Sequence, residues 1–77
     1  MRLVAQVPHP HLRIVVHEYN GKYIVEVEGG RCKQGFKFDK EYYDLTTVQD
    51  WVMKNEAGMM EQMHQMHAWL GTIKPKE

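Results

Sequence analysis

Residues 11–28, HLRIVVHEYNGKYIVEVE, decide the fold, because two β-rich runs are separated by the dipeptide Asn20-Gly21. Asn-Gly is typical of the two-residue type I′ turn of a β-hairpin. Such a turn places Tyr19 opposite Lys22 and pairs each earlier residue with a later one. One side of the hairpin then carries apolar pairs and the other carries mixed pairs, as a sheet with one buried face requires. The predicted buried pairs are Ile14–Val27 and Val16–Val25, and the predicted outer pairs are Arg13–Glu28, Val15–Glu26 and His17–Ile24.

A second tight turn is predicted at Gly29-Gly30, and it pairs Val27 with Cys32 on the buried side. The opposite-charge pairs that this register creates on the outer side are Glu26–Lys33 and Glu28–Arg31. The two turns agree on which face is buried, and this agreement supports both registers. Cys32 should therefore point inward, where a free thiol behaves as a small hydrophobic group. Gln34 is an amide on the apolar side, so it is expected either to reach a helix backbone or to lie at an open edge.

The segment before the hairpin, residues 3–7, is predicted to add a further short strand with Leu3, Ala5 and Val7 on one side. Pro8 and Pro10 should end this strand, since proline has no N–H group to donate to a ladder.

The second half of the chain is predicted to be helical. Thr46 and Gln49 have the spacing of a capping box, and apolar residues then recur at steps of three and four. The predicted stripe is Val48, Val52, Asn55, Met59, Met63, Met66, Leu70 and Ile73. An unbroken helix over 47–70 would be about 36 Å long, which exceeds the roughly 26 Å of an eight-residue strand. We therefore expect either a break near 55–58 or a helix end that projects toward a partner.

These elements predict an α+β fold, an antiparallel β-meander of three to four strands with a C-terminal helix packed on one face. Residues 1–73 form one predicted domain and residues 74–77 a frayed tail. A chain of 77 residues buries only about 60% of its unfolded surface, so an additional metal or partner subunit would add useful stability.

Composition argues against several classes of function. Ten basic and ten acidic residues give a formal net charge of zero, which provides no long-range attraction to nucleic acid or anionic membrane. The single cysteine indicates a reducing compartment, and no apolar run approaches the ~20 residues of a membrane span. We expect a cytoplasmic protein with no cofactor. No glycine-rich phosphate loop or nucleophile–base pair is recognisable, so we expect no enzymatic activity.

The stretch MMEQMHQMHAW, residues 59–69, contains candidate metal ligands at a spacing that could share one ion, which are Met60, Glu61, His64 and His67. One helix supplies two or three ligands in this geometry, so the others would come from His9, His11 or a second chain. The competing interpretation is structural, since methionine readily fills irregular cores and border histidines are common on amphipathic helices. We favour the structural interpretation, and metal binding stays an alternative.

Single-stranded nucleic acid is a further alternative partner, because the outer face of the predicted sheet carries several cations and a tyrosine. These residues are Arg13, Tyr19, Lys22, Arg31, Lys33 and Lys37. Glu26 and Glu28 lie in the middle of the same face and cancel much of the positive field.

The leading hypothesis is a protein-interaction or self-associating module, most simply a homodimer. An apolar patch is predicted on the outer face of the sheet, and two tryptophans flank the helix stripe. The residues are Val15, His17, Tyr19, Ile24, Trp51 and Trp69. The alternative for the tryptophans is that they fold over the edges of the sheet as part of the core.

The front half also resembles a group of short, uncharacterised bacterial proteins in the segments VAQVPHPHLRI, YNGKYIVEVEGG and QGFKFD. The resemblance implies an opening strand, a His-Pro connection, a hairpin and a helical tail. It implies a small bacterial cytoplasmic protein and brings no activity or functional residue with it. The tail rich in methionine and histidine is less typical of that group.

Overall fold

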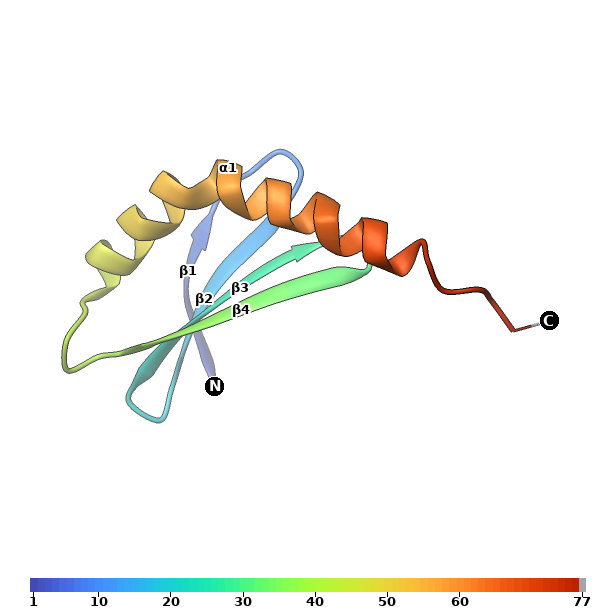
Figure 1. Cartoon of the computed structure of the whole chain (residues 1–77). Coiled ribbons are helices and arrows are strands. Elements are labelled where there is room, and N and C mark those ends of the chain that lie inside the picture. The colour runs from blue at the N-terminus through green and yellow to red at the C-terminus, as the bar shows by residue number, and fades with distance from the viewer. Residues whose placement is uncertain (77) are drawn as a thin grey trace.

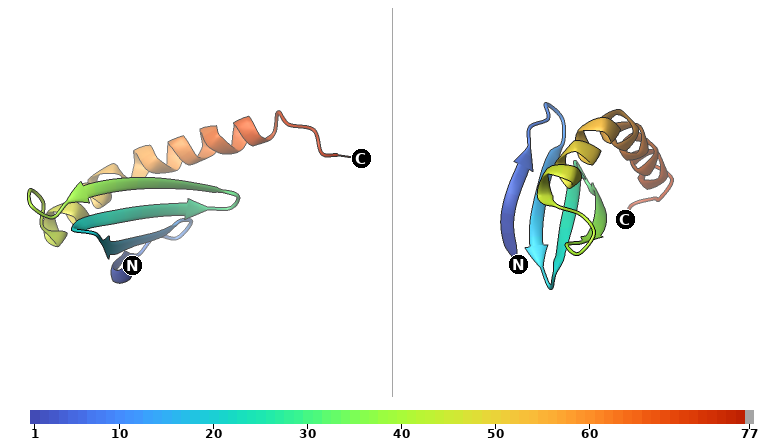
Figure 2. Two further views of the ribbon diagram at one scale, coloured as in Figure 1. Left: turned by 90° about the horizontal axis from the view of Figure 1, so that it is seen from below. Right: turned by 90° about the vertical axis from the view of Figure 1, so that its left-hand side faces the viewer.

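The computed structural model describes residues 1–76 as one antiparallel sheet followed by one long helix (Figure 1). The strands lie in the order β1-β2-β3-β4, so each strand pairs with its neighbours in sequence. The helix lies across one face of the sheet, and no other described element covers the opposite face (Figure 2). The predicted α+β meander is confirmed, with four strands. The elements are β1 (Arg2–Val7), β2 (Arg13–Tyr19), β3 (Lys22–Gly29), β4 (Cys32–Asp39) and α1 (Leu45–Leu70).

The register of the β2–β3 hairpin is confirmed at every predicted pair, including Val16 opposite Val25 and Tyr19 opposite Lys22. Asn20 and Gly21 have φ values of 51° and 71°, as both central residues of a type I′ turn require. This turn therefore places the apolar pairs of both strands on the face that the helix covers.

The predicted turn at Gly29-Gly30 is wrong by one residue. The turn residues are Gly30, with φ 58°, and Arg31, and Gly29 instead pairs with Cys32 inside the ladder. Each residue of β3 consequently meets a β4 residue two positions later than predicted, so Val27 lies opposite Gln34. A shift of two residues preserves the face, because side chains alternate with a period of two. Cys32 is therefore buried as predicted.

Packing explains why a glycine occupies the last position of β3. A Cβ atom on Gly29 would lie 2.8 Å from Cδ2 of Leu12 and 3.3 Å from Cγ of Met63. Both neighbours are themselves buried, which leaves them little room to move. The glycine serves close packing beneath the helix rather than the bend of the chain.

The prediction that Leu3, Ala5 and Val7 share one side is wrong for Leu3. The register of β1 against β2 changes between Leu3 and Ala5, so that Leu3 lies opposite His17 while Ala5 lies opposite Val16. The extra residue, Val4, forms a bulge, which turns the first part of the strand over. Leu3 is 46% exposed as a result, and Val7 remains in the core.

The core consists of the sheet face under α1 together with one stripe of the helix. Val16, Val25, Val27 and Val52 are completely buried. The other buried members of the cluster are Val7, Leu12, Ile14, Cys32, Val48, Met59 and Met63. The structural interpretation of Met59 and Met63 is therefore confirmed, and Met66 and Leu70 pack partly against the same cluster.

The helix begins two residues earlier than the predicted capping box suggests. The N-cap is Asp44, whose carboxylate accepts a hydrogen bond of 2.8 Å from the backbone N–H of Thr47. Thr46 lies inside the helix, so its predicted capping role is wrong. The expected break near 55–58 is also absent, because Asn55 donates its side-chain amide to the carbonyl of Trp51 within one continuous helix.

The chain beyond α1 has no regular secondary structure in residues 74–76. The predicted frayed tail, 74–77, also includes Glu77, which lies outside the described residues. Within the described part of the chain, α1 contains no stretch apolar enough to span a membrane.

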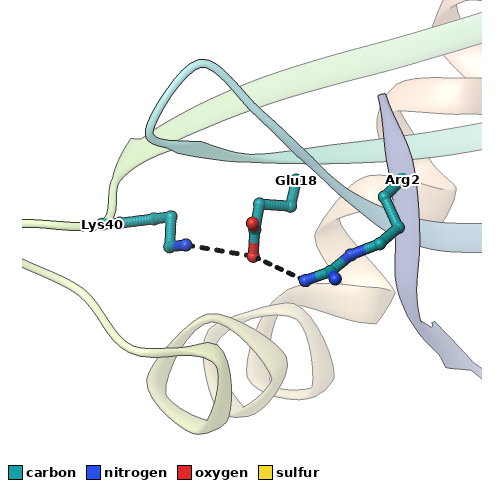
Figure 3. A network of polar contacts seen from close by, with 3 residues as sticks. All are labelled: Arg2, Glu18 and Lys40. Atoms are coloured by element: carbon teal, nitrogen blue, oxygen red, sulfur yellow. Dashed lines mark hydrogen bonds and ion pairs between the residues drawn. The ribbon is translucent and has the colours of Figure 1, made fainter.

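An ion-pair network connects the two edges of the sheet at the end where the chain begins (Figure 3). The carboxylate of Glu18 lies 3.0 Å from Nζ of Lys40 and 3.3 Å from Nη2 of Arg2. Arg2 belongs to β1 and Lys40 directly follows β4, so one carboxylate on β2 bridges the first and last strands. The hydrogen bond from Lys40 lowers the pKa of Glu18, and the charges of Lys40 and Arg2 act in the same direction.

We predict that Glu18→Gln reduces the dependence of stability on pH. Because the pKa of Glu18 is lowered by folding, its contribution is present above the ordinary value of 4.5 and is lost as pH falls through the folded value. Urea titrations between pH 2.5 and pH 7 should show the wild type more stable at neutral pH, with the two proteins converging in acid. Glu41→Gln, at an exposed position without an ion pair in residues 1–76, is the control. An unchanged difference at all pH values would contradict the assignment.

We also predict opposite effects for two glycine substitutions. Gly29→Ala should destabilise the fold by about 1–3 kcal/mol, because the added methyl group overpacks a buried site. Gly58→Ala should stabilise it by about 1 kcal/mol, since Gly58 lies inside α1 with no atom within 4 Å of its would-be Cβ. Chemical denaturation monitored by circular dichroism measures both changes. A neutral Gly29→Ala variant would show that Leu12 and Met63 yield easily.

Candidate interaction surfaces

A groove open to solvent lies between β4 and α1, with a volume of about 250 Å³. We call it the β4–α1 groove. Its lining residues are Gln34, Phe36, Trp51, Asn55, Gly58, Met59 and Gln62. Apolar side chains form its base, because alternate residues of β4 face the helix and the helix turns one strip toward the edge of the sheet.

Trp51 forms one wall of the β4–α1 groove and is half-buried. Its ring packs edge-to-face against Phe36 at 5.1 Å and against Phe38 at 5.0 Å between ring centroids. Such pairs add to the energy of apolar burial. Trp51 thus folds over the edge of the sheet, as the alternative interpretation of this residue predicts, and its outer surface remains at the groove.

Gln34 joins β4 to the middle of the helix. Its amide Nε2 donates a hydrogen bond of 3.1 Å to the backbone carbonyl of Met59. β4 is also the last strand of the sheet, so Gln34 both reaches the helix backbone and lies at the open edge. This hydrogen bond connects the helix to β4, and both of its residues line the groove.

The predicted patch on the outer face of the sheet is only partly exposed. Val15 is 2% exposed, because its neighbours on the same face cover it, and Ile24 is half-buried. Tyr19, at the turn, remains 47% exposed. His17 places Nε2 3.3 Å from Glu26, and its Nδ1 atom is buried without a hydrogen-bond partner in the described chain. The exposed apolar surface on this face is therefore smaller than the four residues suggest.

Carboxylates engage three of the cations on the outer face. Lys33 lies 2.8 Å from Glu26, and this hydrogen bond is the main reason that the pKa of Glu26 is lowered. The other two pairs are Arg13–Glu28 at 3.9 Å and Lys22–Asp39 at 2.6 Å. The register change places Lys33, not Arg31, opposite Glu28. The face is a network of paired charges.

The four candidate metal ligands do not converge on one point. Glu61 and His64 are exposed, whereas Met60 packs against the core. The ring of His67 lies over the turn at Gly30, with Nε2 3.0 Å from the place of a Cβ there. Within residues 1–76, no three His, Cys, Asp or Glu side chains form a group that could hold a metal ion.

The histidines proposed as additional ligands lie in the β1–β2 connection. Nδ1 of His9 accepts hydrogen bonds of 3.1 Å from the backbone N–H groups of both His11 and Leu12. One ring nitrogen of His9 therefore stabilises the loop and is not free to bind a metal. The ring of His11 lies 6.1 Å from that of His9.

The C-terminal end of α1 extends past the sheet (Figure 2). The other tryptophan, Trp69, belongs to the last turn of this helix. Trp69 is 57% exposed, and Ile73, which was predicted to continue the helix stripe, follows the helix and is 70% exposed. Of the two expected arrangements, a helix broken near 55–58 or an unbroken helix whose end projects, the unbroken helix is the observed one. Trp69 belongs to the surface, in contrast to Trp51.

The sequence interpretation did not identify Phe36, Asn55, Gly58 or Gln62 as neighbours of one groove. The two segments are separated by the loop after β4, so only their relative placement brings them together. A signal was present in Gly58, since a glycine inside a helix is unfavourable, and no packing contact within the chain requires one at this position.

Comparison of the chain with protein families, with curated proteins and with solved structures finds no match in any of the three. The resemblance to short uncharacterised bacterial proteins therefore stays a prediction.

We predict that the two tryptophans contribute very differently to stability. Trp51→Ala should lower the free energy of unfolding by about 2–4 kcal/mol, because it removes two aromatic contacts and uncovers the edge of the core. Trp69→Ala should change it by less than about 0.5 kcal/mol, as is usual at exposed sites. Urea denaturation of dilute protein measures both values. Equal losses would show that Trp69 is part of the folded core.

Proposed function

We propose that this protein is a small, non-catalytic module that associates with itself. The observation that carries the proposal is the β4–α1 groove at the free edge of the sheet, in which the half-buried rings of Phe36 and Trp51 present apolar surface to solvent above the buried Met59. Apolar and aromatic surface in a concave site beside polar residues is characteristic of contact regions between proteins.

The size and charge of the chain support the same proposal. The sheet has a single covering layer, and the molecule is elongated, with extents of 48 × 24 × 18 Å. A domain this small gains stability when a second subunit covers its remaining apolar surface. Its formal net charge of zero means that two copies do not repel one another over long distances.

Nucleic-acid and metal binding receive less support from the geometry. Lys22 and Lys33 are already neutralised by nearby carboxylates, which weakens attraction to phosphate. His64 is exposed to solvent, whereas the ring of His67 lies over the β3–β4 turn, so the two side chains have different surroundings. We therefore carry self-association forward as the proposed function.

We predict that sedimentation equilibrium of the wild type shows a mass rising from 9.1 kDa toward twice that value as protein concentration increases. Gly58→Leu should weaken this association, because the added side chain fills the β4–α1 groove. Ala57→Leu is the matched control, since the same side chain is then added at the neighbouring exposed position.

A wild-type chain that remains at 9.1 kDa from about 1 µM to 1 mM would overturn the proposal. Association that Ala57→Leu weakens as much as Gly58→Leu would place the contact outside the groove.

A further inference from the structure

β4 is an edge strand with one free side. It pairs with β3 on one side, and no described strand pairs with it on the other. The β4–α1 groove lies along the helix-covered face of this same edge. A partner that adds a strand to β4 would therefore meet the groove as well.

The hydrogen-bond pattern determines which residues of β4 have free backbone groups. The N–H of Lys40 donates to the carbonyl of Gly21 at 3.0 Å, directly beyond the pair formed by Asp39 and Lys22. In an antiparallel ladder the bonded residues alternate along a strand, so the even-numbered residues of β4 face β3. The backbone groups that face outward belong to Lys33, Gly35, Lys37 and Asp39.

Length and charge together favour one register in which β4 can pair with a second β4, because only pairings centred near the middle of the strand, at residues 35–37, use most of its length. With Phe36 on the two-fold axis, Lys33 lies opposite Asp39 of the second copy, and Gly35 lies opposite Lys37. Moving the axis to Gly35 or to Lys37 instead places lysine opposite lysine, which is unfavourable. Lysines on an edge usually prevent strand pairing, but in this one register each faces either an acid or a glycine.

Two glycines along this edge have no explanation within a single chain. Neither Gly35 in β4 nor Gly58 in α1 has any atom within 4 Å of its would-be Cβ, and neither has a positive φ. Glycine weakens the interior of a strand or helix. In the register centred on Phe36, Gly35 leaves space for the stem of Lys37 from the second copy, and Gly58 leaves the groove open.

From these observations we propose that two copies of this chain associate by antiparallel pairing of β4 with β4, with Phe36 at the two-fold axis. The pairing joins the sheets into one of eight strands and places the two β4–α1 grooves side by side. Phe36 then meets its own counterpart at a non-hydrogen-bonded position, where opposed side chains are closest. The inference rests on the proposed self-association and specifies its surface.

The first test uses proline to block one edge at a time. Gly35→Pro removes an outward N–H that the single chain does not use, and its ring obstructs an added strand. Gln6→Pro is the matched control on the opposite edge. By the same alternation its N–H points away from β2, and its side chain is exposed on the same outer face.

Sedimentation should show the dissociation constant raised at least about tenfold by Gly35→Pro, which removes two inter-chain hydrogen bonds, and unchanged by Gln6→Pro. Circular dichroism confirms that each variant is folded. A folded Gly35→Pro chain that associates as tightly as the wild type overturns the proposal, as does dissociation by Gln6→Pro alone.

The second test uses disulfide formation and does not depend on the proline variants. In a Cys32→Ala background, a Lys33→Cys chain is mixed with an Asp39→Cys chain and oxidised. Opposed positions of an antiparallel pair lie within the Cα separation that a disulfide spans. The mixture should form a cross-linked dimer, and neither chain alone should do so, because each cysteine is then far from its own copy.

Other cross-links identify other arrangements. Cross-linking of Lys33→Cys with itself would indicate parallel strands or an antiparallel register centred on residue 33. Cross-linking of Lys37→Cys with itself would indicate a register centred on residue 37. Either result overturns the proposal. The wild type could also associate while none of these pairs cross-links and Gly35→Pro has no effect. That result would refute pairing through the β4 edge and would leave self-association itself intact. A wild type that is monomeric at every concentration removes the proposed function as well.

Discussion

The opposed valines of the β2–β3 hairpin are the contact on which the rest of the structure depends. Val16 and Val25 face each other with no exposed surface, and Ile14 and Val27 form the next buried pair. The type I′ turn at Asn20-Gly21 aligns them, because its twist matches the twist of the strands. The helix has a continuous apolar layer to cover only because these pairs lie on one face.

The parts of the fold that the sequence predicts are those governed by local pattern. The period of two identifies the buried face of each strand, and it tolerates the error at the β3–β4 turn because a shift of two residues leaves the face unchanged. The same tolerance means that the pattern cannot distinguish the two registers. Gly29 was ambiguous for a related reason, since a glycine required by packing against Leu12 looks the same as one required by a turn.

The features that sequence interpretation missed depend on groups that are distant or compete locally. Asp44 and Thr46 are both good capping residues, and the conformation of the preceding loop decides between them. The bulge at Val4 depends on how β1 meets β2. Trp51 and Trp69 both flank the apolar stripe of the helix in the sequence. In the structure Trp51 covers the edge of the sheet, whereas Trp69 lies past its end. The β4–α1 groove could not be predicted without knowing how β4 lies against α1, and the Gln34–Met59 hydrogen bond helps to define that placement.

The bulge in β1 has a consequence for the size of the proposed assembly. When two β4 strands pair about a two-fold axis, the outer strands of the joined sheet are both β1, and each contains the irregularity between Leu3 and Ala5. A strand with an extra residue is bent and twisted away from the flat geometry that further strand addition needs. The proposed β4–β4 dimer would therefore be closed at two subunits and would not extend into the open-ended growth that leads to fibres.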